Sequence, residues 1–310
     1  MQHLNPRALE YLNAVARFGT IRKAAARLNV DPSAVSRMLS QLEDVVEMTI
    51  WDRSNPKQPI TAAGEELLRY FKKMQASEAA TMSRLHDLVG LRVGEVRIAV
   101  GEGFISDLIS SSLQSFLSAY PGIQISVEMA GALDAVQMLE DNEIDFAITY
   151  APARHPKLNC LIEKRHPLDL IMPSDHPLSN TTAPLAIEDI LNYPLALIDR
   201  STGMGRLVSF VEEVSHVRLE PQLKTNSVAV LTNFVTSGMG ITFMPKFTVI
   251  EEIRAGKISV ISMEHPTLSQ AHARVLSAEG RELTLAAQAF LDHLKHSMSF
   301  LMFNADEIQC

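Results

Sequence analysis

The hydrophobic pattern of the chain changes its period near residue 92. Before that point most apolar residues recur at three- and four-residue steps, the spacing of one helix face. From Gly94 onward, short β-rich runs alternate with helical ones. Because 310 residues exceed one ordinary compact core, the chain is expected to divide into a small, mostly helical head and a larger α/β body.

Three short helices are predicted in the head. The first runs over Pro6–Phe18 and ends at Gly19, and Thr20 is a good amino-terminal cap for a second helix, Ile21–Leu28. Asp31 caps the third helix, whose first turn contains a proline. The second and third helices, joined by a tight turn, predict a helix-turn-helix.

The third helix has two distinct faces. Apolar residues of its inner face lie at i, i+4 and i+7 from Val35, whereas Ser33, Ser36, Arg37 and Ser40 share the opposite face. Short hydroxyl donors and one guanidinium suit base edges and phosphates in a DNA major groove. An ordinary solvated helix face is the alternative interpretation, and the following segment argues against it.

That segment has the pattern of a small β-wing. An apolar pair, Ile50–Trp51, precedes a turn-rich polar tip and a return strand at Ile60, so Arg53 and Lys57 are expected to meet the phosphate backbone. The candidate DNA-binding residues are Thr20, Arg22, Lys23, Pro32, Ser33, Ser36, Arg37, Ser40, Gln41, Arg53, Lys57 and Thr61.

Four motifs of the head, in their order and spacing, resemble LysR-type transcriptional regulators: Ala25-Ala26-Arg27-Leu28, Ala34-Val35-Ser36-Arg37 with Leu42-Glu43, Ile50-Trp51-Asp52-Arg53, and Ile60-Thr61-Ala62-Ala63-Gly64. The chain departs from the family at Pro32–Ser33, where members often carry Gln-Pro, so the usual Gln contact to DNA is absent. The resemblance implies double-stranded DNA with an inverted-repeat operator, RNA polymerase, and a homodimer or homotetramer as partners.

A long helix is predicted from Thr61 to about Val89, with a length of about 40 Å. Such a helix on a small head cannot bury a long apolar seam alone, so pairing with a second copy is expected. The alternative is that the seam packs on its own chain. The seam residues are Leu67, Phe71, Met74, Leu85 and Leu88.

The body contains two series of alternating strands and helices. The first has predicted strands at 96–100, 123–129 and 146–150 and helices at 105–119 and 132–139, and it indicates a mainly parallel sheet covered by helices. The second runs through segments 168–171, 195–198, 207–214, 223–225, 228–235 and 241–244. The inward side chains predicted for the 105–119 helix are Leu108, Ile109, Leu113, Phe116 and Leu117.

The LysR resemblance continues through the body, in Gly94–Ile98, Phe116 with Tyr120–Gly122, Asp145–Ile148, His176–Leu178, and Gly238–Ile241 with Pro245. It implies an α/β effector module similar to a periplasmic binding protein, in which the chain crosses between subdomains near Glu163 and near Met263. The predicted domains are a winged helix-turn-helix at 4–61, a linker and dimerisation helix at 62–92, and an effector-binding domain at 93–300. Subdomain I comprises 93–163 and 264–300, and subdomain II comprises 164–263.

Ligands of such sheets bind beyond the carboxyl ends of the strands. The small residues, hydroxyls and helix starts found there favour a small anion such as a carboxylate. Glu102 would oppose an anion if its side chain faced inward, so a neutral polar compound is the alternative. The candidate effector-binding residues are Gly103, Phe104, Ile105, Gly131, Tyr150, Ser201, Thr202, Asn226 and Ser227.

Charge is unevenly distributed. Residues 1–92 carry a net charge of +3 within a chain of −8, which fits DNA binding by the head alone. Cys160 and Cys310 make no disulfide framework or zinc spacing, and no cofactor or metal is expected. Four histidines near prolines are interpreted as surface residues: His155, His166, His176 and His265.

Other function classes fit less well. A transport-type binding protein would need export, and the amino terminus lacks the apolar core of a signal peptide, so a cytoplasmic protein without membrane contact is expected. An enzyme is not expected, since the chain has no Gly-x-Ser-x-Gly, Walker or His-Glu-x-x-His motif, and Gly101-x-Gly103 lacks the third glycine of a dinucleotide fingerprint.

Overall fold

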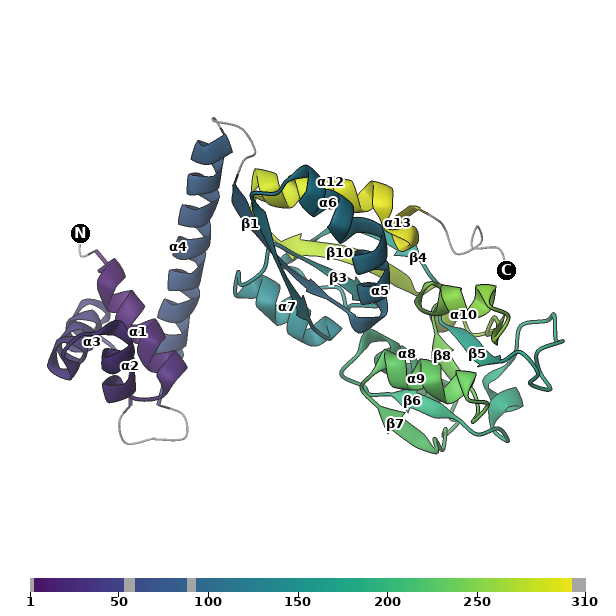
Figure 1. Ribbon diagram of the computed structural model, residues 1–310. Coiled ribbons are helices and arrows are strands. Elements are labelled where there is room, and N and C mark those ends of the chain that lie inside the picture. The colour runs from purple at the N-terminus through teal and green to yellow at the C-terminus, as the bar shows by residue number, and fades with distance from the viewer. Residues whose placement is uncertain (1–2, 53–58, 88–92, 303–310) are drawn as a thin grey trace. The chain divides into compact units, whose positions relative to one another are not determined.

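The computed structural model describes residues 3–52, 59–87 and 93–302 (Figure 1). The chain forms two compact units, Met1–Thr81 and Met82–Cys310. None of the helices in the described ranges is long and apolar enough to cross a membrane.

The first unit is a helix-turn-helix closed by a short β-bridge. Its helices α1 (Pro6–Phe18), α2 (Ile21–Leu28) and α3 (Pro32–Val46) begin at the caps Asn5, Thr20 and Asp31. Each cap side chain accepts a hydrogen bond from a first-turn amide, which satisfies a donor that has no partner within the helix. The helices enclose a core built around Leu9, Leu12, Val15, Ala24, Val35, Leu39 and Leu42.

A side chain of α3 and the close approach of α4 (Ala62–Asp87) fix the base of the wing, where Trp51 and Ile60 form an antiparallel bridge. Glu43 Oε1 accepts hydrogen bonds from the Ile50 amide at 2.9 Å and from the Trp51 amide. A side chain at Gly64 would lie 2.4 Å from the Ile50 carbonyl, so only glycine allows α4 to approach so closely.

The first turns of α4 belong to the core of the first unit. Leu67 and Phe71 are buried, Phe71 to 4% exposure, and Met74 packs beside them. The prediction that these residues stay exposed without a second copy is therefore wrong, because the helix-turn-helix of the same chain covers them. Leu85, by contrast, is 53% exposed, and Leu88 lies outside the described residues.

The second unit has the expected two α/β subdomains. Subdomain I is a five-stranded sheet in the order β2-β1-β3-β10-β4, in which only β10 runs antiparallel to its neighbours. Its strands are β1 (Gly94–Val100), β2 (Ile123–Met129), β3 (Phe146–Tyr150), β4 (Leu158–Arg165) and β10 (His272–Ala278).

Helices cover both faces of this sheet (Figure 1). One face carries the helical stretch α5 (Ile105–Asp107), η2 (Leu108–Leu113) and α6 (Gln114–Ala119), together with α12 (Leu285–Ser297) and α13 (Ser299–Met302). The other face carries α7 (Ala132–Glu140). A buried ion pair between Arg281 and Asp145 ties the loop after β10 to the start of β3.

Two of the predicted inward side chains point outward. Leu108 and Phe116 are fully buried, but Ile109 is 58% exposed and Leu117 is also exposed. The reason is that residues 108–113 form a π-helical turn, whose wider repeat aligns positions four apart, so Ser112 takes the inward place between Leu108 and Phe116.

Subdomain II is built from two smaller sheets. An antiparallel sheet has the order β8-β5-β9, and β6 pairs in parallel with β7. Its strands are β5 (Asp169–Pro173), β6 (Ala196–Ile198), β7 (Leu223–Thr225), β8 (Thr242–Met244) and β9 (Ile258–Ile261). Its helices are η3 (Ile187–Ile190), α8 (Gly203–Val214), α9 (Val228–Thr236), η4 (Lys246–Val249) and α10 (Ile250–Arg254).

The chain passes between subdomains twice. It leaves subdomain I between Arg165 and Asp169, and it returns through α11 (Pro266–Ser269) to β10. Glu163, where the first crossing was predicted, lies inside β4 and binds Arg274 of β10 at 2.6 Å. An apolar core continues across both crossings, where Phe104 stacks on Phe247 of subdomain II at 4.8 Å between ring centroids.

Candidate DNA-binding surface and effector cleft

The outer face of α3 is exposed at Ser33, Arg37, Ser40 and Gln41, and Ser36 is half-buried. Asp31 caps this helix by accepting a hydrogen bond from the Ser33 amide at 2.7 Å. Hydrogen bonds from the Ser33 side chain and amide, with the nearby Arg37 charge, lower the pKa of Asp31 below its usual range. The face thus presents one cation and several hydroxyls next to an ionised cap.

The other predicted DNA-binding residues differ in exposure and in their hydrogen bonds. Arg22 and Lys23 are exposed on α2, and Thr20 is its cap. Thr61 is occupied in the wing base, where its hydroxyl donates to the Thr49 carbonyl at 2.7 Å and accepts from the Gly64 amide. Pro32 is exposed in the first turn of α3. Arg53 and Lys57 lie outside the described residues.

A cleft of about 230 Å³ lies between the two subdomains of the second unit. The loops that follow β1, β2, β6, β7 and β8 meet there with the end of β3, as expected for strand carboxyl ends. It is lined by seven of the predicted effector residues, namely Gly103, Phe104, Gly131, Tyr150, Ser201, Thr202 and Asn226. Sequence analysis missed other lining residues, which carry no local signal: Met129, Asp134, Thr149, Met204, Phe247 and Thr248.

Two predicted effector residues do not line this cleft. Ile105 lines a second cleft instead. Ser227 caps α9 and donates its hydroxyl to Glu102 at 2.8 Å. Tyr150 does line the cleft, but its hydroxyl donates to the His166 carbonyl at 2.7 Å, and burial raises its pKa well above the usual range. Tyr150 therefore contributes its aromatic ring, and not its hydroxyl, to the lining of the cleft.

Glycines let the two subdomains approach closely at the cleft. A side chain at Gly203 would lie 1.8 Å from the Tyr150 carbonyl across the subdomain boundary. A side chain at Gly131 would lie 3.3 Å from the Ser201 carbonyl. These two positions set the start of α8 against the end of β3, and the start of α7 against the loop that precedes α8.

The cleft offers amide donors but no cationic side chain. Its lining contains no Lys, Arg or His, and its charged members are Glu102 and Asp134. The first-turn amides of Ala132, Gly203 and Met204 have no protein acceptor in the described part of the chain. Such amides at helix starts bind anions without the help of a basic residue.

The carboxylate of Glu102 occupies the third helix start at the cleft. It follows β1 in subdomain I and reaches across to α9 of subdomain II. Its oxygens accept hydrogen bonds from the Ser227 hydroxyl at 2.8 Å, the Val228 amide at 2.7 Å and the Ala229 amide at 3.1 Å. The inward-facing Glu102 considered from the sequence is thus paired with protein donors.

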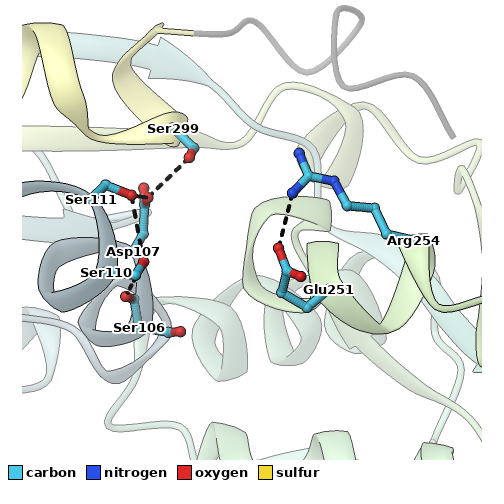
Figure 2. Close-up of polar contacts among 7 residues, drawn as sticks. All are labelled: Ser106, Asp107, Ser110, Ser111, Glu251, Arg254 and Ser299. Carbon is cyan, nitrogen blue, oxygen red and sulfur yellow. Dashed lines mark hydrogen bonds and ion pairs between the residues drawn. The ribbon is translucent and has the colours of Figure 1, made fainter.

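Beyond Glu102 a second cleft of about 620 Å³ opens between α5–η2 and α9–α10. Figure 2 shows Asp107 on one side, where it accepts hydrogen bonds from Ser111 at 2.8 Å and Ser299 at 3.0 Å. Across from it Glu251 pairs with Arg254 at 2.9 Å. Six of the seven side chains in this view, all except that of Ser106, are already engaged within the chain, so the second cleft is less suited to ligand recognition than the first.

The interpretation of four histidines as surface residues is wrong for His166. It is 2% exposed, its Nε2 lies 2.8 Å from the Phe300 carbonyl, and its ring packs against Phe247. Proline at the next position marked a loop, but this loop is the buried crossing between subdomains. His155, His176 and His265 are partly buried. Within the described residues no cluster of three or more His, Cys, Asp or Glu could hold a metal ion.

Two family models match the chain. Residues 6–65 match the model described as bacterial regulatory helix-turn-helix protein, lysR family, and residues 90–299 match the LysR substrate binding domain. Among curated proteins, the HTH-type transcriptional activator CmpR of Synechocystis sp. is 25% identical over 297 residues, which cover 95% of this chain and 96% of that relative.

Solved structures share the fold. CbnR complexed with its target DNA has a TM-score of 0.60 at 17% identity, over 94% of this chain and 99% of that one. The regulatory domain of Synechocystis CcmR in complex with 2-PG has a TM-score of 0.55 at 22% identity, over 65% of this chain and 96% of that one.

Proposed function

The chain belongs to the LysR family of DNA-binding transcriptional regulators, which respond to small-molecule effectors, and from this premise we propose that its intersubdomain cleft binds a small organic acid. The acid group would lie at the starts of α7 and α8. The observation that carries the proposal is the set of unpaired first-turn amides of Ala132, Gly203 and Met204 beside a cavity of about 230 Å³.

The size and charge of the cleft support a compact ligand with one acid group. A volume of 230 Å³ is below the usual range for drug-sized ligands, roughly 300–1,000 Å³. Glu102 and Asp134 oppose a second acid group. The regulatory domain of the relative CcmR was solved with 2-PG, which supports the broader class of small organic acids; 2-phosphoglycolate itself carries two acid groups, a phosphate and a carboxylate, so it is not the one-acid ligand expected here.

The test removes one amide donor and leaves its helix intact. Ala132 is the first residue of α7, where proline is tolerated, and the backbone of Gly131 (φ −66°, ψ 162°) is compatible with a following proline. We expect Ala132→Pro to weaken the binding of small organic acids about tenfold, since a charge-assisted hydrogen bond contributes about 1.5–3 kcal/mol. Calorimetric titration of the full chain with glycolate, acetate and 2-phosphoglycolate measures this effect.

Ala132→Ser is the matched control, because it changes the side chain and keeps the amide. Its affinity for the acids should stay near that of the wild type. If Ala132→Pro bound the acids as tightly as Ala132→Ser does, the acid group would lie elsewhere. If only neutral compounds such as ethylene glycol bound, the effector would belong to the neutral polar class.

At the other end of the chain, the proposed DNA contacts are the outer face of α3 and the wing. The exposed Arg37, Ser40 and Gln41 support this assignment, as does the fold shared with CbnR, which was solved with its target DNA. Assembly into dimers or tetramers through the exposed part of α4 and contact with RNA polymerase are proposed from the family.

A further inference from the structure

Glu102 belongs to subdomain I, yet its carboxylate ends at a helix of subdomain II. It accepts all three of its hydrogen bonds there, from Ser227, Val228 and Ala229, which stand 125 or more positions further along the chain. The neighbouring contacts hold it in place. A side chain at Gly103 would lie 2.8 Å from the Thr248 side chain, and Phe104 stacks on Phe247.

This arrangement has the chemistry of an anion-binding site that is already occupied. The start of a nine-residue helix offers two amides that have no acceptor within the helix, a hydroxyl and the positive end of its dipole. The occupant is a carboxylate supplied by the other subdomain. We propose that Glu102 is a specificity-determining residue, a tethered anion that fills the amino terminus of α9 and keeps the acid group of an effector away from it.

The proposal sets the orientation of the effector. With α9 occupied, an acid group meets the amides of α7 and α8 only, and the Glu102 charge repels any second one. Three of the roughly four lone-pair positions of the Glu102 carboxylate are used, so one remains for a donor on the ligand. The ligand end that faces α9 should therefore carry a hydroxyl or an ammonium group.

Chemical rescue tests whether the α9 terminus is an anion site that Glu102 fills. In full-length Glu102→Ala the site is vacated, and the midpoint of thermal unfolding should fall by about 2–6 °C. Free acetate, a small carboxylate, should then raise the midpoint, relative to sodium chloride at equal ionic strength, by more than it does in the wild type. Hydrogen exchange of the peptide 226–236 should quicken in the variant and slow again with acetate.

Glu251→Ala is the matched control, because Glu251 lies on the second cleft, is exposed, and contacts no helix start of the first cleft. It should respond to acetate as the wild type does. Equal acetate responses in all three proteins, together with acetate-independent exchange of 226–236 in Glu102→Ala, would overturn the proposal. Hydrogen exchange of the peptide 226–236 tests the proposal even if Glu102→Ala unfolds at the same temperature as the wild type.

This inference rests on the proposed function only in taking the first cleft as the effector site. An acetate response shared by wild type, Glu102→Ala and Glu251→Ala reports binding at α7 and α8. The additional response of Glu102→Ala alone reports the vacated α9 terminus. Absence of the shared response would therefore contradict the proposed acid site at α7 and α8. Absence of the additional response in Glu102→Ala would contradict the proposed role of Glu102.

Discussion

Arg37 carries the one guanidinium on the exposed face of α3, and we expect it to recognise a DNA base. Arg37→Ala should cost about 1–3 kcal/mol on the specific operator if the side chain makes a paired contact to guanine. Gel-shift titrations on a DNA fragment that the wild type binds specifically and on random DNA measure this difference. Equal losses on both DNAs would show that Arg37 contacts phosphates rather than bases.

The buried ring of His166 should make the free energy of unfolding depend on pH. Burial is the largest cause that lowers the pKa of its ring below the ordinary value of 6.5, although the Phe300 carbonyl raises it. The unfolded chain therefore takes up a proton as the pH falls through 6.5, while the folded chain takes it up only at lower pH. Stability is unaffected above this pH and falls below it.

Urea unfolding above and below pH 6.5 checks the prediction. His166→Gln keeps a hydrogen-bond donor without a titrating ring, so its stability should fall less on acidification than that of the wild type. An equal fall in both proteins would assign the pH dependence to other groups.

At the scale of the element, α4 divides into two parts with different roles. Phe71 lies in the core of the DNA-binding unit, so Phe71→Asp should unfold that unit, with a loss of about 3–5 kcal/mol, rather than release intact monomers. Leu85 is exposed, so Leu85→Asp should leave the unit folded and lower the mass of the assembly. Sedimentation with circular dichroism separates the two effects. Unchanged mass for Leu85→Asp would place self-association elsewhere.

For the whole molecule, the prediction of a LysR-type regulator with an α/β effector module is confirmed. The bounds of α1, β2 and β3 were predicted because caps and apolar runs are local signals. The contact of Glu102 with Ser227 spans 125 positions, and nothing in either segment encodes it. The burial of Phe71 was missed for a related reason, since periodicity identifies an apolar seam without showing which surface covers it.

The wing base also carries the chain's single tryptophan, Trp51, partly buried against the core of the DNA-binding unit. Tryptophan emission from this protein is therefore a signal from one place, where Glu43 binds the Trp51 amide and Ile60 completes the bridge. The effector unit contributes none of it. A spectral shift on addition of an effector would report communication between the two units, with no label attached and no DNA present.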